Sequence, residues 1–147
     1  DAQVCTEAVE TIVETNTYLS SVGFESGGLA AAHGIQKGFT FIPALHQQLH
    51  GFNVAFCVLA QLVLENSLVE LKEVMDFSDS VGLPICFADL GYVDVMPEEV
   101  RTAAEKACVP TSTIHNMPFE VTSAMVYEAL MAADAYGRAY HAQKKMI

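Results

Sequence analysis

The sequence predicts an all-α fold, one domain of six or seven helices, and three observations lead to it. Apolar residues recur at the 3.6-residue period of amphipathic helices along most of the chain. No alternating strand pattern lasts for more than a few residues, and no linker is long enough to divide the 147 residues. Hydrophobic residues make up 52% of the chain and Trp is absent, as in closely packed helices rich in Ala, Val and Leu.

Two helices are predicted in the first part of the chain. The first begins after Thr6, a suitable N-cap, and runs to about Ser20, because its apolar residues share one face. The run GFESGG at residues 23–28 is expected to break this helix. Ser26 is then expected to cap a second helix, which passes through His33 and ends near Gly38.

The middle of the chain is predicted to form the centre of the domain. A short helical piece after Pro43 is expected to carry both His46 and His50. The next helix, over residues 53–65, is apolar on nearly all sides, which is typical of a helix buried in a core. Another helix is predicted over residues 68–81, where a glycine and a proline follow and end it.

The last third of the chain is predicted as two helices joined by an irregular segment. Pro97 suits the first position of a helix that runs to about Cys108. Residues 109–119 contain two prolines and are expected to be irregular. Thr122 is the expected N-cap of the final helix, which runs toward Lys144.

The chain is strongly acidic, with seven Lys and Arg against 18 Asp and Glu and a net charge of −11. An acidic surface repels phosphate backbones and anionic lipids, so neither nucleic acid nor a membrane surface is an expected partner. The longest apolar stretch, residues 54–64, is much shorter than the roughly 20 residues that a membrane-spanning helix needs.

The cysteines are scattered and form no C-x-x-C pair; they are Cys5, Cys57, Cys86 and Cys108. No signal-peptide pattern opens the sequence, which starts at Asp1 without an initiator Met. Scattered thiols that sit in apolar or helical patterns are typical of a reducing compartment. The sequence therefore predicts a cytoplasmic location.

The histidines are the candidates for chemistry. His33 follows an Ala-rich run and is either a ligand or a hydrogen-bonded core residue. On one helix, His46 and His50 would share a face and chelate a metal, although such pairs also occur by chance on polar faces. His115 either approaches a site or bonds to the backbone of its own loop, and His141 is expected to be solvated. From the residues alone, the metal site stays incomplete and names no reaction.

Several motifs are spread over the whole chain: YLSSVGFESGGLAAAH at 18–33, HG at 50–51, QLVLEN at 61–66, VGLP at 81–84, TIHNMP at 113–118 and AADAYG at 132–137. Together they resemble the C-terminal domain of bacterial glycerol dehydrogenases. These enzymes belong to the iron-containing alcohol dehydrogenase family, which has a dehydroquinate synthase-like fold. The resemblance implies an all-α, multi-helix domain that belongs to an oxidoreductase.

The resemblance also implies a metal site. In that family one Asp and two His hold a divalent metal, which is zinc in glycerol dehydrogenases. The two His match His33 and His50, which are 17 positions apart (50 − 33). His46 falls where the family varies and is expected beside the ligands or in solvent. Phe24 matches a residue at the edge of the substrate pocket, and the implied reaction is NAD-dependent oxidation of glycerol, or a small polyol, to a hydroxyketone such as dihydroxyacetone.

The chain departs from the family pattern in two ways. The Asp ligand and the NAD-binding half lie upstream in the family, in a stretch that this sequence lacks, and Asp1 does not match that ligand. Phe52 and Asn53 stand where the family usually has Glu and Lys, which removes a partner that supports such a site. We therefore expect a single helical domain over residues 1–147 that is inactive without an N-terminal NAD-binding half.

Assembly is a further implication of the resemblance, since glycerol dehydrogenases form homo-oligomers. Two alternatives to an enzyme fragment remain at this point. In the first alternative the chain is a non-catalytic metal-binding domain that kept the fold of the family, and in the second it is an oligomerisation domain that kept this fold.

Overall fold

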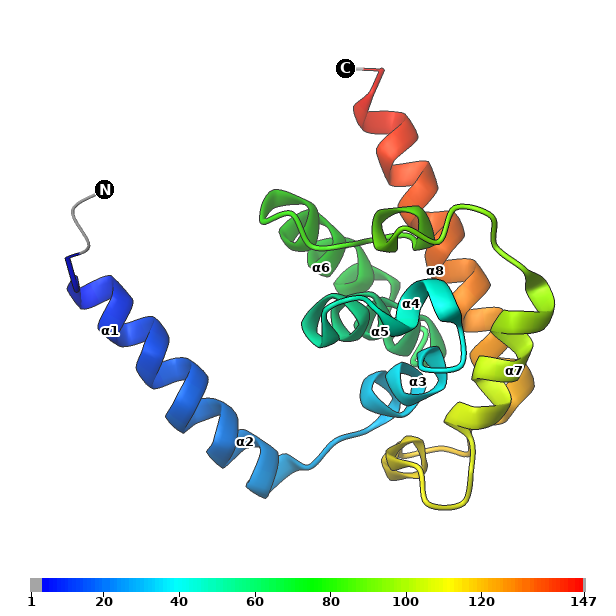
Figure 1. Cartoon of the computed structure of the whole chain (residues 1–147), viewed down its shortest axis with the longest axis horizontal. Coiled ribbons are helices and arrows are strands. Elements are labelled where there is room, and N and C mark those ends of the chain that lie inside the picture. The colour runs from blue at the N-terminus through cyan, green and yellow to red at the C-terminus, as the bar shows by residue number, and fades with distance from the viewer. Residues whose placement is uncertain (1–3, 147) are drawn as a thin grey trace.

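The computed structural model of the protein describes residues 4–146, so Asp1 lies outside the described residues. Between those limits the chain forms helices and no strand, which confirms the predicted all-α class (Figure 1). The α-helices are α1 (Glu7–Glu14), α2 (Ser20–Gly27), α3 (Ala31–Phe39), α4 (Pro43–His46), α5 (His50–Leu64), α6 (Leu68–Ser80), α7 (Pro97–Ala107) and α8 (Ser123–Lys144). A π-helical turn, η1 (Thr15–Leu19), joins α1 to α2, and two 3₁₀ turns are η2 (Phe87–Leu90) and η3 (Thr113–Asn116).

Helix α1, the turn η1 and helix α2 form one long rod that projects from the helical body (Figure 1). The helix ends within the run 23–28, as predicted, but only at its last residues, because it continues through Gly23 and Ser26 to Gly27 and has Gly28 as its C-cap. Gly28 has a φ of 69°, a left-handed conformation that glycine adopts at little cost. Ser26 thus lies inside α2 and caps nothing, and α3 starts instead after Ala30, without a side-chain cap.

The apolar face of the rod is exposed. Thr6 caps α1 as predicted, and its hydroxyl accepts a hydrogen bond from the Val9 amide. The rod nevertheless has no buried residue, and large apolar side chains stand in solvent along it, among them Val9, Ile12, Val13, Leu19 and Val22. The amphipathic pattern predicted a helix correctly, but its apolar face has no partner among the described residues.

The body is built around α5, which packs against α3, α6 and α8. This confirms the central position predicted from its apolar sequence. Four aromatic rings fill the middle of the core, with the closest pair, Phe56 and Phe87, 4.8 Å apart between centroids. The Phe39 centroid lies 6.3 Å from that of Phe56 and 6.1 Å from that of Phe87. The Tyr92 ring completes the cluster at 5.6 Å from Phe87.

Two glycines allow backbones to approach each other closely in the body. A Cβ at Gly38 of α3 would lie 2.2 Å from the Ala103 carbonyl oxygen of α7. A Cβ at Gly137 of α8 would lie 1.9 Å from the Ile85 carbonyl oxygen, at the entry to η2. Real Cβ atoms do not approach an oxygen so closely, so both contacts require glycine, and they fix α3 on α7 and η2 on α8.

The helix starts in the last third of the chain are confirmed. Pro97 occupies the first turn of α7, and the Thr122 hydroxyl accepts a hydrogen bond from the Met125 amide at the start of α8. The predicted irregular segment at 109–119 contains η3, whose Ser112 side chain accepts from the Ile114 amide. The turn η2 was not predicted, because only four residues form it.

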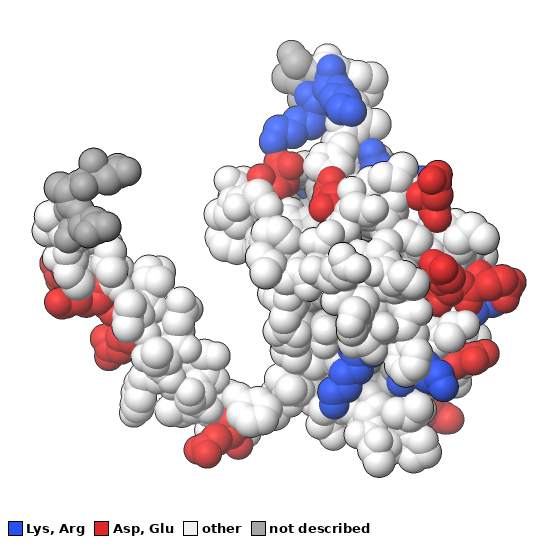
Figure 2. Space-filling view, in the orientation of Figure 1, with Lys and Arg blue, Asp and Glu red and all other residues white. Residues whose placement is uncertain are grey.

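Acidic side chains lie along the rod and over the body, while Lys and Arg gather at the C-terminal end of α8 and at the opposite end of the body (Figure 2). Among the described residues, no helix combines the length and the apolar character that crossing a membrane requires.

Candidate metal centre

His33 lies in the first turn of α3, and three hydrogen bonds fix the start of this helix. The Ala32 amide donates to Gln61 Oε1 of α5, at 2.9 Å. In the segment just before α3, the Ala30 carbonyl accepts from the Thr113 hydroxyl at 3.1 Å. The Leu29 carbonyl accepts from the Asn116 side chain at 2.7 Å in the same way. These partners belong to α5 and η3, so the hydrogen bonds fix the start of α3, and with it the half-buried His33, on the body of the protein.

His50 is the first residue of α5, and it is exposed. The predicted helical piece carrying both His46 and His50 is wrong, since α4 ends at His46 and residues 47–49 separate the two helices. Asn53, one turn after His50, is buried, and its side chain donates to the Leu45 carbonyl at the end of α4, at 2.9 Å. Its Oδ1 atom is buried without a hydrogen-bond partner among the described residues.

The structure brings the rings of His33 and His50 together. Their centroids are 5.6 Å apart and their planes are inclined by 48°. Burial lowers the pKa of His33, and the neighbouring His50 and Lys37 lower it further. His33 therefore favours the neutral imidazole, which is the form that has a free lone pair for a metal.

The two rings alone do not complete a metal site. Among residues 4–146, no Cys, Asp or Glu joins the pair to make a group of three ligands. Imidazole suits zinc and neighbouring divalent metals, which need further ligands from a protein or from water. The arrangement can thus supply two nitrogen ligands and needs further ligands to complete a metal site.

The other predicted site residues lie apart from this pair or are exposed. Phe24 is 58% exposed on α2, outside the hydrophobic core, so its place at a substrate pocket stays a prediction. His46 is exposed at the end of α4. His115 Nε2 lies 3.1 Å from the Val109 carbonyl oxygen, so its ring bonds to the backbone of its own loop. Phe52 is half-buried and packs against the core.

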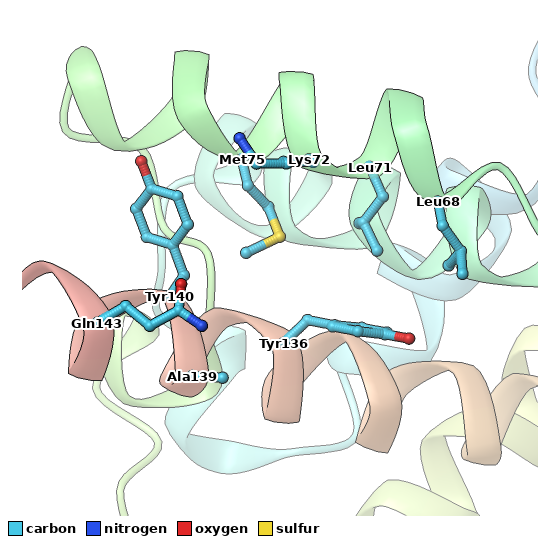
Figure 3. Close-up of a pocket in the computed structure, with 8 residues that line it drawn as sticks. All are labelled: Leu68, Leu71, Lys72, Met75, Tyr136, Ala139, Tyr140 and Gln143. Atoms are coloured by element: carbon cyan, nitrogen blue, oxygen red, sulfur yellow. The ribbon is translucent and has the colours of Figure 1, made fainter.

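A groove between α6 and α8 has a volume of about 340 Å³ (Figure 3). Apolar and aromatic side chains line most of it, including Leu71, Met75 and Tyr136. Neither predicted metal ligand belongs to it, and its lining offers no carboxylate or imidazole. The groove is therefore not a candidate for metal chemistry.

A second group of ligand-type side chains lies at the C-terminal end of α8. Cys86, Asp89 and His141 bring one potential ligand atom each to within 4.8 Å of the others. The prediction that His141 is solvated is wrong, because its half-buried ring lies between Asp89 and Asp79. No local pattern in the sequence indicates this contact, since His141 and Asp89 are 52 positions apart.

The ionisable groups of this second cluster are perturbed. Burial raises the pKa of the Cys86 thiol. Burial acts to raise the pKa of Asp89 as well, but hydrogen bonds from His141 and from the Ile85 amide outweigh it and lower the pKa. The Asp89 carboxylate is thus stabilised in its charged form.

No family model matches the sequence, but comparison with individual proteins finds close similarity. Glycerol dehydrogenase from Pseudomonas putida is 54% identical over 138 residues, which is 93% of this chain and 38% of that protein. A probable glycerol dehydrogenase from Sinorhizobium meliloti has a solved structure with 44% identity and a TM-score of 0.87, over 93% of this chain and 39% of that one. For the glycerol dehydrogenase structure from Schizosaccharomyces pombe the identity is 37% and the TM-score 0.91, over 98% of this chain and 37% of that one.

The chain thus spans less than two fifths of the length of each of these proteins. The similarity extends over both the rod and the helical body, since it covers more than nine tenths of the chain.

Proposed function

This chain is homologous to the C-terminal part of glycerol dehydrogenases, and we propose that it is the metal-binding part of an NAD-dependent, zinc-dependent polyol dehydrogenase. The substrate is glycerol or a similar small polyol, and the product of glycerol oxidation is dihydroxyacetone. In this proposal residues 1–147 form the single helical domain of a longer, cytoplasmic protein. The NAD-binding half is a separate N-terminal part of that protein.

One observation carries the proposal. His33 and His50 come from the starts of two different helices, and their rings lie 5.6 Å apart between centroids. The residues fit a divalent ion, since imidazoles presented by separate helices are typical zinc ligands. A divalent metal held there would act as a Lewis acid on a hydroxyl of the polyol.

The residues around the pair would hold its geometry. Gln61 fixes the first turn of α3 on α5, and Thr113 and Asn116 hold the segment that leads into α3. These hydrogen bonds restrict the movement of His33 relative to His50, as the partners behind metal ligands commonly do. In the same proposal Phe24 lines the edge of the polyol pocket, and the third metal ligand is an Asp of the N-terminal half.

The exposed rod supports the need for another part of the protein. Its apolar face, which includes Val9, Ile12 and Leu19, is unpartnered among the described residues. Exposed apolar stripes of this kind mark contact surfaces. We place the N-terminal half of the enzyme, or a second copy in a homo-oligomer, against this face.

The activity test compares two proteins. We expect the purified 147-residue chain to show no NAD-dependent oxidation of glycerol, even with zinc added, because it brings only two metal ligands and lacks the NAD-binding half. A longer protein that contains this chain should oxidise glycerol and lose the activity when a chelator removes its metal. Turnover by the chain alone, or a longer protein that leaves glycerol and other small polyols unchanged, would contradict the proposal.

The same exposed stripe favours the alternative of a non-catalytic oligomerisation or metal-binding domain. The activity test of the longer protein distinguishes a dehydrogenase from such a non-catalytic domain. A longer protein that binds zinc through His33 and His50, assembles, and yet oxidises no polyol would support this alternative.

A further inference from the structure

The cluster at the C-terminal end of α8 has the composition of a second metal site, separate from the His33–His50 pair. Cys86 is the N-cap residue of the turn η2, Asp89 lies within this turn, and His141 comes from α8. One ligand atom from each lies within 4.8 Å of the other two. The His141 Nε2 atom is 3.0 and 3.2 Å from the two oxygens of Asp89.

The backbone around these ligands is held firmly on α8. Gly137, one turn before His141, lets the Ile85 carbonyl contact α8 directly, with Cys86 beside it. The Phe87 amide donates to the buried carboxylate of Asp134, at 2.9 Å. The position of η2 relative to His141 is therefore fixed by close packing and by a buried hydrogen bond.

The Asp89 carboxylate is oriented before any ion binds. Its Oδ2 atom accepts from the Ile85 amide at 3.0 Å and from the Cys86 amide at 3.2 Å. These bonds hold Oδ2, while Oδ1 accepts no backbone hydrogen bond from the described residues and faces His141 Nε2 at 3.2 Å, so a cation would bind in place of this contact. Such fixed outer partners are typical of metal sites in proteins.

The second nitrogen of His141 also faces a carboxylate. The Nδ1 atom lies 4.0 Å from Asp79 Oδ1, and Lys144 forms an ion pair with the other oxygen of Asp79. Without an ion, Nε2 is the nitrogen that donates to a carboxylate, at 3.0 Å from Asp89. A bound cation would take the place of this proton, and Asp79 would face the proton on Nδ1. A helix cap would explain Cys86 and Asp89, but it does not account for an imidazole held between two carboxylates.

The cluster has room for a fourth ligand. It lines a cavity of about 490 Å³, to which Arg138 and Lys145 also contribute. Arg138 is paired with the Asp134 carboxylate, so its charge is partly compensated. Figure 2 shows acidic side chains next to the Lys and Arg side chains at this end of the molecule. An open position beside three protein ligands is where a water molecule completes a tetrahedral zinc site.

We propose that Cys86 Sγ, Asp89 Oδ1 and His141 Nε2 bind one divalent transition-metal ion of the zinc type. The thiolate and imidazole ligands select zinc or cobalt over the hard ions magnesium and calcium. On binding, the Cys86 thiol releases its proton to solvent, and His141 releases its Nε2 proton to solvent while Nδ1 carries the remaining ring proton. The sulfur and Nε2 then form bonds to the metal, with no change of oxidation state. The thiolate and the Asp89 carboxylate together balance the charge of the ion.

Cobalt is the probe for this site, because a Co²⁺–thiolate bond gives a charge-transfer band in the near ultraviolet. The metal-free 147-residue chain, kept reduced with a phosphine, should bind Co²⁺ and develop this band together with the visible bands of four-coordinate cobalt. Cys86→Ser should abolish the charge-transfer band. His141→Gln should weaken Co²⁺ affinity by at least tenfold, and Asp79→Asn by roughly tenfold.

Matched variants separate this site from other thiols and from the first pair. Cys5→Ser and Cys108→Ser change an exposed and a half-buried thiol elsewhere and should leave the band unchanged. The His33→Ala/His50→Ala variant should leave it unchanged too, so this test can fail while the proposed function stands. His141→Gln changes a half-buried side chain, and it decides the matter if Cys86→Ser unfolds in circular dichroism.

Three results would overturn the proposal. They are the absence of a thiolate band in the unmodified chain, its persistence in Cys86→Ser, and its loss in Cys5→Ser or Cys108→Ser.

Discussion

Replacing both His33 and His50 with Ala is expected to abolish metal binding at the first pair and, in the longer enzyme, polyol oxidation with it. The double variant removes both nitrogen ligands that this chain brings to the site. Loss of a partner behind a metal ligand already costs about 10–100-fold in affinity, so loss of two ligands should exceed ~100-fold. A Lewis-acid metal contributes several kcal/mol to transition-state stabilisation, and kcat/KM should fall by roughly a thousandfold or more.

The measurement is a zinc titration by calorimetry in a His141→Gln background, which removes a ligand of the second site. The matched control is His46→Ala, which changes an exposed histidine at the end of α4 and should leave zinc affinity unchanged. Zinc affinity that survives the loss of both imidazoles, or that falls equally in His46→Ala, would show that the metal binds elsewhere.

Gly137→Ala is expected to destabilise the body strongly, although alanine normally favours a helix by about 1 kcal/mol over glycine. The new Cβ would lie 1.9 Å from the Ile85 carbonyl oxygen and 2.7 Å from its carbon. Both atoms belong to the backbone, so η2 has to move away from α8. Its separation would weaken the hydrogen bond from the Phe87 amide to the buried Asp134. Overpacking of this kind costs about 1–3 kcal/mol or more, and we expect a value of about 3 kcal/mol or above.

Urea denaturation, followed by circular dichroism, measures this effect. Gly51→Ala is the matched control, because Gly51 also lies in a helix but a Cβ there meets no atom within 4 Å. That variant should be unchanged or up to about 1 kcal/mol more stable. Equal midpoints for the two variants would mean that η2 is not fixed on α8 as described, and the geometry of the Cys86 cluster would then lose its support.

The helices were predictable where a local signal decides their ends. Pro97 and Thr122 mark helix starts by their own backbone and side-chain chemistry, and both predictions are confirmed. The break predicted at residues 23–28 falls at the end of that run, because Gly23 is tolerated inside the helix and only Gly28 takes the left-handed conformation that ends it. Glycine content alone does not reveal which glycine has a positive φ.

The candidate sites were predictable to different degrees. Spacing suggested His46 with His50, yet the structure pairs His33 with His50, a contact that only the family resemblance indicated. The contact of His141 with Asp89 depends on how α8 packs against η2, and no local pattern encodes a contact across 52 positions. The amphipathic pattern of α1 predicted a helix but not what covers its apolar face.

Anomalous diffraction at the zinc absorption edge, on zinc-containing crystals of the protein, tests the central claim most directly. We expect a peak between the two rings, with one nitrogen of His33 and one of His50 each about 2.0–2.1 Å from it. A peak bound to only one of these rings, or two rings that turn away from each other and bind no shared ion, would contradict a metal centre built on this pair.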